Sequence, residues 1–413
     1  MLRKIVIEHY RSCIRTSFEC HPRLSVLIGP NSSGKTNLLQ AIMLLNKLSQ
    51  IESHERSRPE GVTITARLRA TFDVKKESGN LSAKIASYTD DSNNDILVGA
   101  RQKWSLLNKK GQRASTEIPF PGDIYPSEFW GKLGEPVYMG YRRLSPLSFY
   151  YNRPRIPPWG VKIIGKITRF CSGMRYYGAS QFTNPGTCPV SFEIEKEGGR
   201  SRPWRLKGHA RTLYDLYVAQ KGRSHGRYDQ FLDIVGSNGL GLIDKITFRE
   251  IRTSLTEYSV RVGGKIERRR VEKVLIIPQF KRGRNILSPN QLSEGTFKTL
   301  ALLFYIVTEE STALLLEEPE VCVHQGLLSS ILELIKKYSN EKQMIVSTHS
   351  DYVLDHVEPE NVLSVKADPK EGTIVRHLRK TMSNREYAAL RYYLEHEGNL
   401  GEYWREGGLE EKK

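Results

Sequence analysis

The first fifty residues pass from strand-like to helix-like spacing of apolar side chains. Residues 4–8 and 14–20 alternate apolar and polar positions, and residues 24–28 form a short apolar run, so three strands are expected. A helix is predicted over residues 35–48, where the apolar side chains are Leu38, Leu39, Ile42, Met43 and Leu45. The order is strand, glycine-containing loop, helix.

The middle of the chain contains a predicted sheet and a segment of different composition. Residues 62–73 and 96–107 alternate apolar and polar side chains, which is typical of a half-exposed antiparallel sheet. The polar residues 75–94 between them are expected to form a loop or hairpin tip. Residues 138–211 are rich in Pro, Gly, Arg and aromatic side chains, which should break any long helix and indicate an inserted subdomain.

Regular patterns return in the later residues. Helices are predicted at 212–220, 228–235, 293–308, 324–338 and 352–357, and strands at 245–251, 258–262, 274–278, 313–316 and 344–347. Helix and buried strand alternate in the last third, which predicts an α/β fold with parallel strands beside the antiparallel ones. We expect one lobe at residues 1–137, an inserted basic α+β subdomain at 138–240, and the rest of the α/β domain at 241–413.

The composition of the chain indicates which ligands and which cellular compartment to expect. The net charge of +17 and the isoelectric point near 9.5 favour nucleic acid, nucleotides or an acidic partner as ligands. The five cysteines form no C-x-x-C pair, which argues against a disulfide framework or zinc knuckle and for a reducing, cytoplasmic location. The N-terminus lacks a signal-peptide pattern and no apolar run is long enough to cross a membrane, so a soluble protein is expected.

The loop after the third predicted strand matches G-x-x-x-x-G-K-[ST] at every fixed position. It consists of Gly29, Pro30, Asn31, Ser32, Ser33, Gly34, Lys35 and Thr36. Its glycines let backbone N–H groups converge on phosphates, Lys35 can reach the β- and γ-phosphates, and Thr36 can offer its hydroxyl to Mg²⁺. A chance glycine-rich turn is the alternative, but the flanking strand and helix supply the context that the motif requires. The loop predicts binding of a nucleoside triphosphate.

Two adjacent acids follow a later apolar strand. Residues 313–316 lead into Glu317 and Glu318, whose side chains should leave the strand end on opposite sides. We assign Glu317 to Mg²⁺, through water, and Glu318 to the general base that activates the attacking water. Without the phosphate loop, a solvated charge run would be the better interpretation.

Two further segments can complete the site. His349 follows the strand at 344–347 and can hydrogen-bond a γ-phosphate or the attacking water, although a lone His after a strand is more often structural. Residues 290–298 place Ser293 or Gly295 at a helix N-terminus, which suits either ordinary capping or a second anion site. The order of all four segments decides between these interpretations.

That order resembles the ATP-binding-cassette (ABC) head of the RecF, SMC, Rad50 and OLD group. The likeness is greatest to the compact AAA15/AAA21 ATPases of prokaryotes, some of which occur in anti-phage systems. The motifs that carry it lie in residues 1–40 and 289–357. The resemblance implies ATP and Mg²⁺ as cofactors, with Lys35 and Thr36 as ligands, Glu318 as the catalytic glutamate and His349 as the switch histidine.

The resemblance also implies a homodimer. Two ATP molecules would lie between the Gly29 loop of one subunit and Ser293 and Gly295 of the other. Gln181 is the candidate for the family's Q-loop glutamine, and an incidental Gln in a buried aromatic strand is the alternative. Glu317 stands where many members have Asp, which could relax the metal geometry.

Two features of larger relatives are missing from the sequence. No heptad pattern is long enough for the coiled-coil arm of SMC and Rad50 proteins. The residues after Ser350 contain no Asp-x-Asp, which the Toprim nuclease of OLD-type proteins needs, so intrinsic nuclease activity is not expected.

Basic residues cluster at 142–143, 153–155, 200–205, 268–270 and 281–284, several with aromatic neighbours, as expected for binding nucleic acid with little sequence specificity. A solvated face or a docking surface for an acidic protein is the alternative.

We expect an ATP-hydrolysing ABC-type ATPase that controls nucleic acid or a nuclease or other effector partner, with anti-phage defence implied by resemblance alone. A RecF-like DNA repair ATPase and a scaffold with structural ATP are the other hypotheses.

Overall fold

A computed structural model of the 413-residue chain describes residues 1–49, 64–89, 95–118, 156–178, 185–197, 200–201, 208–222, 225–260, 266–308, 311–321, 323 and 325–406. Internal contacts divide the chain into two compact units. Unit 1 comprises Met1–Tyr176, Glu310–Glu318 and Ser339–Lys413, and unit 2 comprises Tyr177–Glu309 and Pro319–Tyr338. No helix in these described ranges is long and apolar enough to span a membrane.

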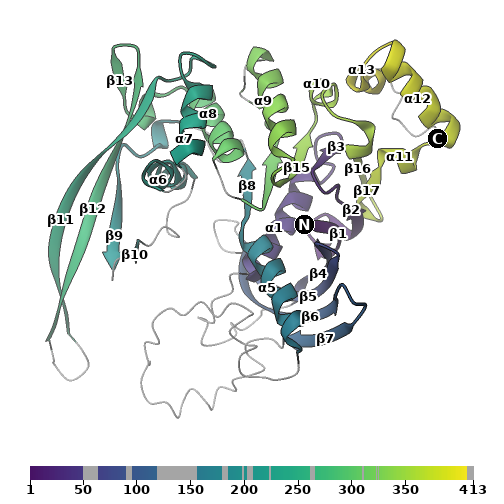
Figure 1. Ribbon diagram of the computed structural model, residues 1–413, viewed down its shortest axis with the longest axis horizontal. Coiled ribbons are helices and arrows are strands. Elements are labelled where there is room, and N and C mark those ends of the chain that lie inside the picture. The colour runs from purple at the N-terminus through teal and green to yellow at the C-terminus, as the bar shows by residue number, and fades with distance from the viewer. Residues whose placement is uncertain are drawn as a thin grey trace. The chain divides into compact units, whose positions relative to one another are not determined.

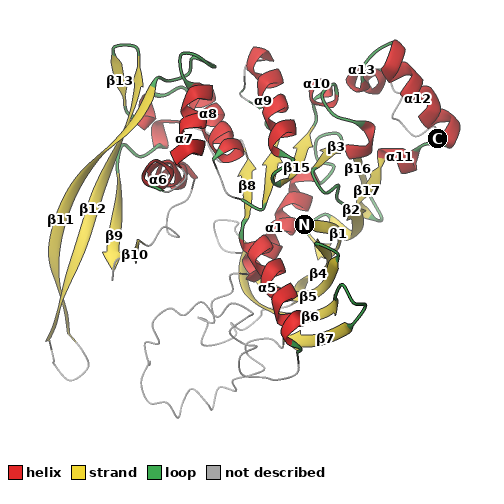
Figure 2. Ribbon diagram, in the orientation of Figure 1, coloured by secondary structure: helices red, strands yellow, loops and turns green. Residues whose placement is uncertain are grey.

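Unit 1 is built on a mixed sheet, drawn in Figures 1 and 2. Its twelve described strands are ordered β7-β6-β5-β4-β1-β2-β17-β16-β3-β15-β14-β8. Their bounds are β1 Leu2–Tyr10, β2 Cys13–Glu19, β3 Leu24–Ile28, β4 Ile64–Val74, β5 Glu77–Thr89, β6 Asp95–Leu107, β7 Arg113–Ile118, β8 Met174–Gly178, β14 Ala313–Glu317, β15 Gln343–Thr348, β16 Val362–Asp368 and β17 Gly372–His377. The last two residues of β8 fall in unit 2.

The parallel half of this sheet is its most buried part. β14 pairs with β15, β15 with β3, and β3 with β16, all in parallel. Every residue of β3 and β15 is buried, as expected for strands covered on both faces. The prediction of an α/β fold with mixed parallel and antiparallel strands is confirmed.

The antiparallel half contains a strand that the sequence analysis missed. Residues 77–89 form β5, whereas a loop or hairpin tip was expected at 75–94. Their Ser, Asn and Gly content obscured an alternation in which Leu81, Ala83 and Ile85 are buried. The turn before β5 consists of Lys75 and Lys76, which both have positive φ.

The described residues of unit 1 contain the helices α1 Lys35–Ser49, α5 Pro158–Ser172, α10 Asp351–Leu354, α11 Leu378–Thr381, α12 Asn384–His396 and α13 Leu400–Arg405. The prolines and glycines around 157–165 were expected to prevent a long helix, and α5 corrects this. Pro157 is the N-cap and Pro158 the first residue, where a missing N–H costs no hydrogen bond. Ile163, Ile164 and Ile167 are then buried at helical spacing.

Unit 2 combines an antiparallel sheet with helices. Its strands are β9 Phe192–Glu197, β10 Arg200–Ser201, β11 Lys245–Val260, β12 Ile266–Arg282 and β13 Asn285–Leu287, and its helices are α6 Gly208–Lys221, α7 His225–Val235, α8 Glu294–Val307 and α9 Gln325–Tyr338. Short 3-10 helices lie at Pro185–Thr187 and Pro289–Gln291, and a third at Pro359–Asn361 belongs to unit 1. β11 and β12 pair along their whole length, so the two short strands expected at 245–251 and 258–262 are one strand.

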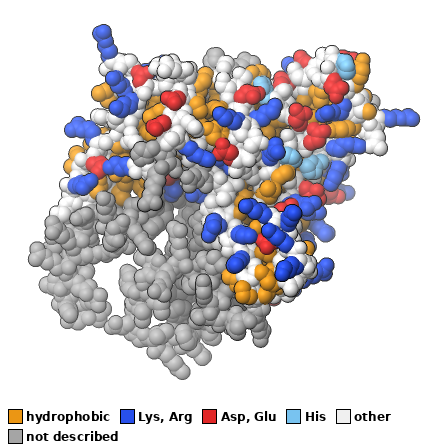
Figure 3. Space-filling model, in the orientation of Figure 1, with side chains coloured by type: hydrophobic (Ala, Val, Ile, Leu, Met, Phe, Trp, Pro, Cys, Tyr) orange, Lys and Arg blue, Asp and Glu red, His pale blue; other side chains and the backbone are white. Residues whose placement is uncertain are grey.

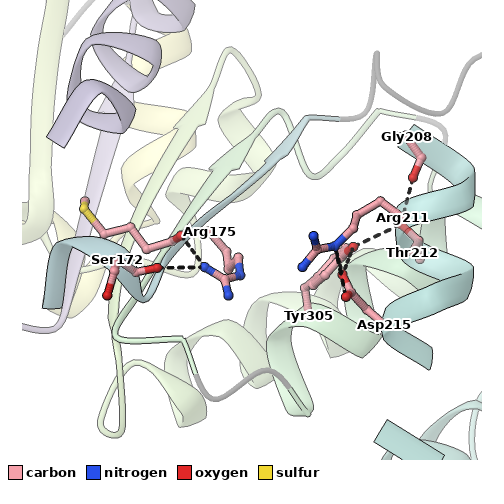
Figure 4. Close-up of polar contacts among 8 residues, drawn as sticks. Ser172, Arg175, Gly208, Arg211, Thr212, Asp215 and Tyr305 are labelled. Atoms are coloured by element: carbon pink, nitrogen blue, oxygen red, sulfur yellow. Dashed lines mark hydrogen bonds and ion pairs between the residues drawn. The ribbon is translucent and has the colours of Figure 1, made fainter. Parts of the chain in front are cut away.

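Polar contacts within each unit fix the chain locally (Figure 4). In unit 2, Nε of Arg211 on α6 lies 3.0 Å from both carboxylate oxygens of Asp215. The hydroxyl of Tyr305 on α8 donates to Asp215 at 3.3 Å and lies 3.0 Å from the Thr212 hydroxyl, which joins the two helices. In unit 1, Arg175 donates to the Ser172 and Met174 carbonyls at 3.1 and 3.0 Å, closing the turn between α5 and β8.

Asn46 of α1 provides a test of this packing. Its buried Nδ2 contacts the carbonyl oxygens of Cys171, Ser172 and Met174 at 3.0–3.1 Å, linking α1 to the end of α5. Asn46→Ala leaves buried acceptors unpaired and should lower the free energy of unfolding by about 1–3 kcal/mol, measured by urea denaturation. The exposed Lys47→Ala control should change it by less than about 0.5 kcal/mol. Equal effects of the two variants would contradict this role of Asn46.

Candidate functional site

The phosphate-type loop lies where the sequence places it, between β3 and α1. Both glycines of this loop are required by their surroundings. A Cβ on Gly29 would lie 2.1 Å from the Val365 carbonyl oxygen, and one on Gly34 would lie 2.0 Å from Thr373 Oγ1. Gly34 also has φ of +98°, which favours glycine. Strands β16 and β17 therefore press against the loop and fix its shape.

Lys35 and Ser33 provide polar groups inside this loop. The Lys35 side chain donates from Nζ to the carbonyl oxygens of Gly29 at 2.8 Å and Pro30 at 3.0 Å, and the residue is 5% exposed. Its positive charge is thus held within the loop. The buried Ser33 hydroxyl has no hydrogen-bond partner among the described residues. A buried cation and an unsatisfied buried hydroxyl fit an anionic, oxygen-rich ligand such as a triphosphate.

Glu317, the last residue of β14, accepts hydrogen bonds from two hydroxyl groups. The Thr36 hydroxyl donates to its Oε1, and the Tyr176 hydroxyl of β8 donates to its Oε2. Burial, followed by the nearby Glu317 carboxylate, raises the pKa of Tyr176 well above its ordinary value. Tyr176 therefore stays protonated, and it holds one carboxylate oxygen while Thr36 holds the other.

Tyr176 is the site residue that the sequence analysis missed. Its signal was weak, because it stands in an aromatic stretch that attracted attention only through Gln181. The contact joins residues 141 positions apart, so no local motif reveals it. Gln181 itself lies outside the described residues.

Glu318 and His349 form a second pair beside the first. Glu318 has φ of +45°, so the chain turns sharply where β14 ends, and its N–H donates to the Ser347 carbonyl at 2.9 Å. His349 follows β15, and its Nδ1 lies 3.3 Å from Glu318 Oε1. The His349 side chain is 43% exposed and the Glu318 side chain is 32% exposed, so water can reach both. A strained backbone at this position is a feature associated with functional sites.

The available side-chain ligands fit Mg²⁺ that keeps water and phosphate ligands better than a metal ion enclosed by protein side chains. The described part of the chain contains no cluster of three or more His, Cys, Asp or Glu side chains that could enclose a metal. Thr36 and Glu317 instead bring together one hydroxyl and one carboxylate. Mg²⁺ is commonly held by one or two such ligands, with phosphate and water oxygens completing its octahedron.

Ser293 and Gly295 lie in unit 2, at the start of α8. Ser293 is the N-cap, and its Oγ accepts from the Thr296 N–H at 3.2 Å. Helix capping is thus observed in this chain. The Ser293 side chain remains exposed, and Gly295 is half-buried.

The sequence is similar to a known family over two separate segments. The profile of a family described as "AAA domain, putative AbiEii toxin, Type IV TA system" matches residues 24–86 and 241–355. The "DNA replication and repair protein RecF" of Staphylococcus epidermidis is 35% identical over 81 residues, which are 20% of this chain and 20% of that protein. The matched part thus spans only a fifth of the RecF chain.

Solved structures with low sequence identity are also similar. The "SMC head domain from Thermotoga maritima" has 14% identity and a TM-score of 0.38, covering 91% of this chain and 98% of that one. An SMC head solved bound to the C-winged helix domain of ScpA has 12% identity and a TM-score of 0.42, covering 91% and 96%.

Tyr176→Phe tests whether the Tyr176 hydroxyl positions Glu317. Loss of one hydrogen bond worth about 0.5–1.5 kcal/mol should raise the Mg²⁺ concentration for half-maximal metal-dependent nucleotide binding about two- to tenfold. Nucleotide affinity without Mg²⁺ should not change. The measurement is a Mg²⁺ titration of fluorescent ATP-analogue binding.

The matched control for that experiment is Tyr177→Phe in the same strand. The Tyr177 hydroxyl donates to the Lys298 carbonyl at 2.9 Å, whereas the Tyr176 hydroxyl donates to Glu317. If both variants shift the Mg²⁺ titration equally, Tyr176 has no specific effect on Glu317.

Proposed function

Since the chain carries an ABC-type ATPase head of the RecF/SMC group, we propose that it binds ATP with Mg²⁺ and hydrolyses it at the end of its parallel strands. The observation that carries the proposal is that functional residues following three neighbouring strands lie at one sheet edge. β3 leads into the loop that holds Lys35, β14 ends at Glu317 and Glu318, and β15 ends beside His349.

The residues at this sheet edge have different roles in the proposed hydrolysis. Lys35 and the N–H groups of the loop bind the phosphates and orient the γ-phosphate. Thr36 and Glu317 would hold Mg²⁺, which neutralises charge on the phosphate oxygens when bound. Glu318 then orients and deprotonates the attacking water, for which its partial exposure and carboxylate are suited. His349, at 3.3 Å, holds the Glu318 carboxylate and can contact the γ-phosphate.

We further propose that the working form is a homodimer with ATP between subunits. The support is the motif order together with the exposed Ser293 at the N-terminus of α8, where backbone N–H groups favour an anion. Ser293 and Gly295 of a second copy would contact the γ-phosphate held by the first. Gln181 keeps its proposed Q-loop role.

The dimer would control nucleic acid, or a nuclease or other effector protein, in a prokaryotic defence setting. The family description, which names a putative AbiEii toxin, supports the defence setting. A RecF-like role in DNA repair is the second candidate, because the match to RecF covers 81 residues at 35% identity. Salt-sensitive, ATP-stimulated DNA binding by the protein alone would favour the RecF-like role.

Glu318→Gln tests hydrolysis and dimerisation together. The amide keeps the shape of the side chain but cannot accept a proton, so turnover should fall by about 10²–10⁴-fold while ATP binding persists. The variant should accumulate as a dimer with Mg²⁺ and ATP. Phosphate release measures the first effect and size-exclusion chromatography with light scattering measures the second.

Lys35→Ala is the companion variant, because it should abolish ATP binding and dimerisation alike. Wild-type turnover indistinguishable from that of Glu318→Gln would refute the enzyme proposal and favour structural ATP. Dimerisation of Glu318→Gln without nucleotide would refute the ATP-sandwich interface.

A further inference from the structure

One face of the antiparallel half of unit 1 is covered with polar side chains. Residues on β2, β1, β4, β5 and β6 alternate, and their inward positions such as Leu68, Leu81 and Trp104 are buried. The outward positions form what we call the outer sheet face. Six basic residues of this face lie among the side chains that the structure describes, and all six are exposed: Lys4, Arg15, Arg67, Arg69, Lys84 and Lys103.

The basic residues of the outer sheet face exceed what its acids can neutralise. Arg69 lies 2.5 Å and Arg15 3.9 Å from Glu8, and Lys4 lies 3.8 Å from Glu19. Arg67, Lys84 and Lys103 form no ion pair in the described part of the chain, although the strand register places Glu8 opposite Arg67 and Glu117 opposite Lys103.

Two of these unpaired cations oppose each other directly. Arg67 of β4 is the cross-strand partner of Lys84 of β5. Like charges at directly opposite positions destabilise a sheet. Folding therefore gains nothing from this pair, whereas a bound polyanion would turn the repulsion into attraction.

Small polar side chains and the half-buried Val6 occupy the positions between the cations. Ser17, Thr71, Asn80, Ser82 and Ser105 stand among the cations. With Lys4, Arg69 and Lys103 they line a hollow of 480 Å³. Hydroxyl, amide and cationic groups in one surface are the groups that contact phosphates and sugars in nucleic-acid complexes. Five strands spaced about 4.8 Å apart make this surface about 19 Å wide, enough for several phosphates.

The face also lacks what other partners would need. Its described outward residues on β1, β2, β4, β5 and β6 include no aromatic side chain. Protein interfaces are enriched in aromatic residues at their core, and single-strand binders stack bases on aromatic rings. Recognition of the sugar–phosphate backbone of a duplex needs no aromatic side chain. Figure 3 shows that Lys and Arg side chains also gather on the visible side of this part of unit 1, over α5 and β4–β7.

We propose that the outer sheet face binds the sugar–phosphate backbone of double-stranded nucleic acid without reading its sequence. The inference rests on the proposed function, because it identifies the nucleic acid that the ATPase controls. It also assigns binding to residues outside the basic clusters that the sequence pattern emphasised.

The triple variant Arg67→Gln, Lys84→Gln, Lys103→Gln tests the proposal in the full-length protein. Fluorescence anisotropy with a 30-base-pair duplex, repeated across salt concentrations, gives the slope of log Kd against log salt. Each lost phosphate contact should reduce that slope by about 0.9, so the triple variant should lose about 2.7. The control is Lys370→Gln, Lys380→Gln, Arg385→Gln, which removes the same charge from exposed positions elsewhere in unit 1. The control should keep the wild-type slope.

Three results would overturn the proposal: an unchanged slope in the triple variant, no duplex binding by wild type, or preferential binding of single strands or polyglutamate over duplex. Basal ATP turnover without nucleic acid should be the same in both triple variants and wild type. If turnover is normal and the slope is unchanged, the surface assignment fails while the ATPase proposal stands. Thermal unfolding checks that both triple variants fold, because the Arg67, Lys84 and Lys103 substitutions remove the Arg67–Lys84 repulsion together with the cations opposite Glu8 and Glu117.

Discussion

The parallel pairing of β3 with β15 and of β15 with β14 is the constraint on which the candidate site depends. Parallel strands end at the same edge of a sheet, so residues from positions 29–36, 317–318 and 349 meet although the chain separates them widely. Burial of β3 and β15 on both faces keeps this register fixed, because a slip would move every side chain. The buried strands thus position the candidate site, and the residues at the strand ends carry its reactive groups.

The two halves of the sheet in unit 1 have different consequences. The parallel half is covered on both faces, and only its edge is free to bind a ligand. The antiparallel half is buried on one face only, which leaves a polar face for a larger partner. Both surfaces carry cations, so both favour phosphate: one the triphosphate of a nucleotide, the other the backbone of a nucleic acid.

Much of the fold and site could be predicted because the signals are local. The phosphate loop is eight consecutive residues, and the strand before it and helix after it appear in the periodicity. The acid pair and His349 follow apolar runs that are unmistakable strands. β5 was missed because its outward positions are polar, with Asn80, Ser82 and Lys84 exposed, and α5 was missed because Pro157 and Pro158 begin the helix instead of breaking it. Tyr176 could not be predicted, since its contact with Glu317 exists only once β8 joins the sheet.

The proposed ATPase activity depends on binding of a triphosphate at the carboxyl edge of β3, β14 and β15. Hydrogen–deuterium exchange of the wild-type protein, with and without Mg²⁺ and ATP, tests it most directly. We expect slower exchange in peptides covering residues 29–36, 317–318 and 347–349, and no change in the tip of the β12–β13 hairpin at residues 282–285. Unchanged exchange in residues 29–36 at saturating nucleotide would contradict it.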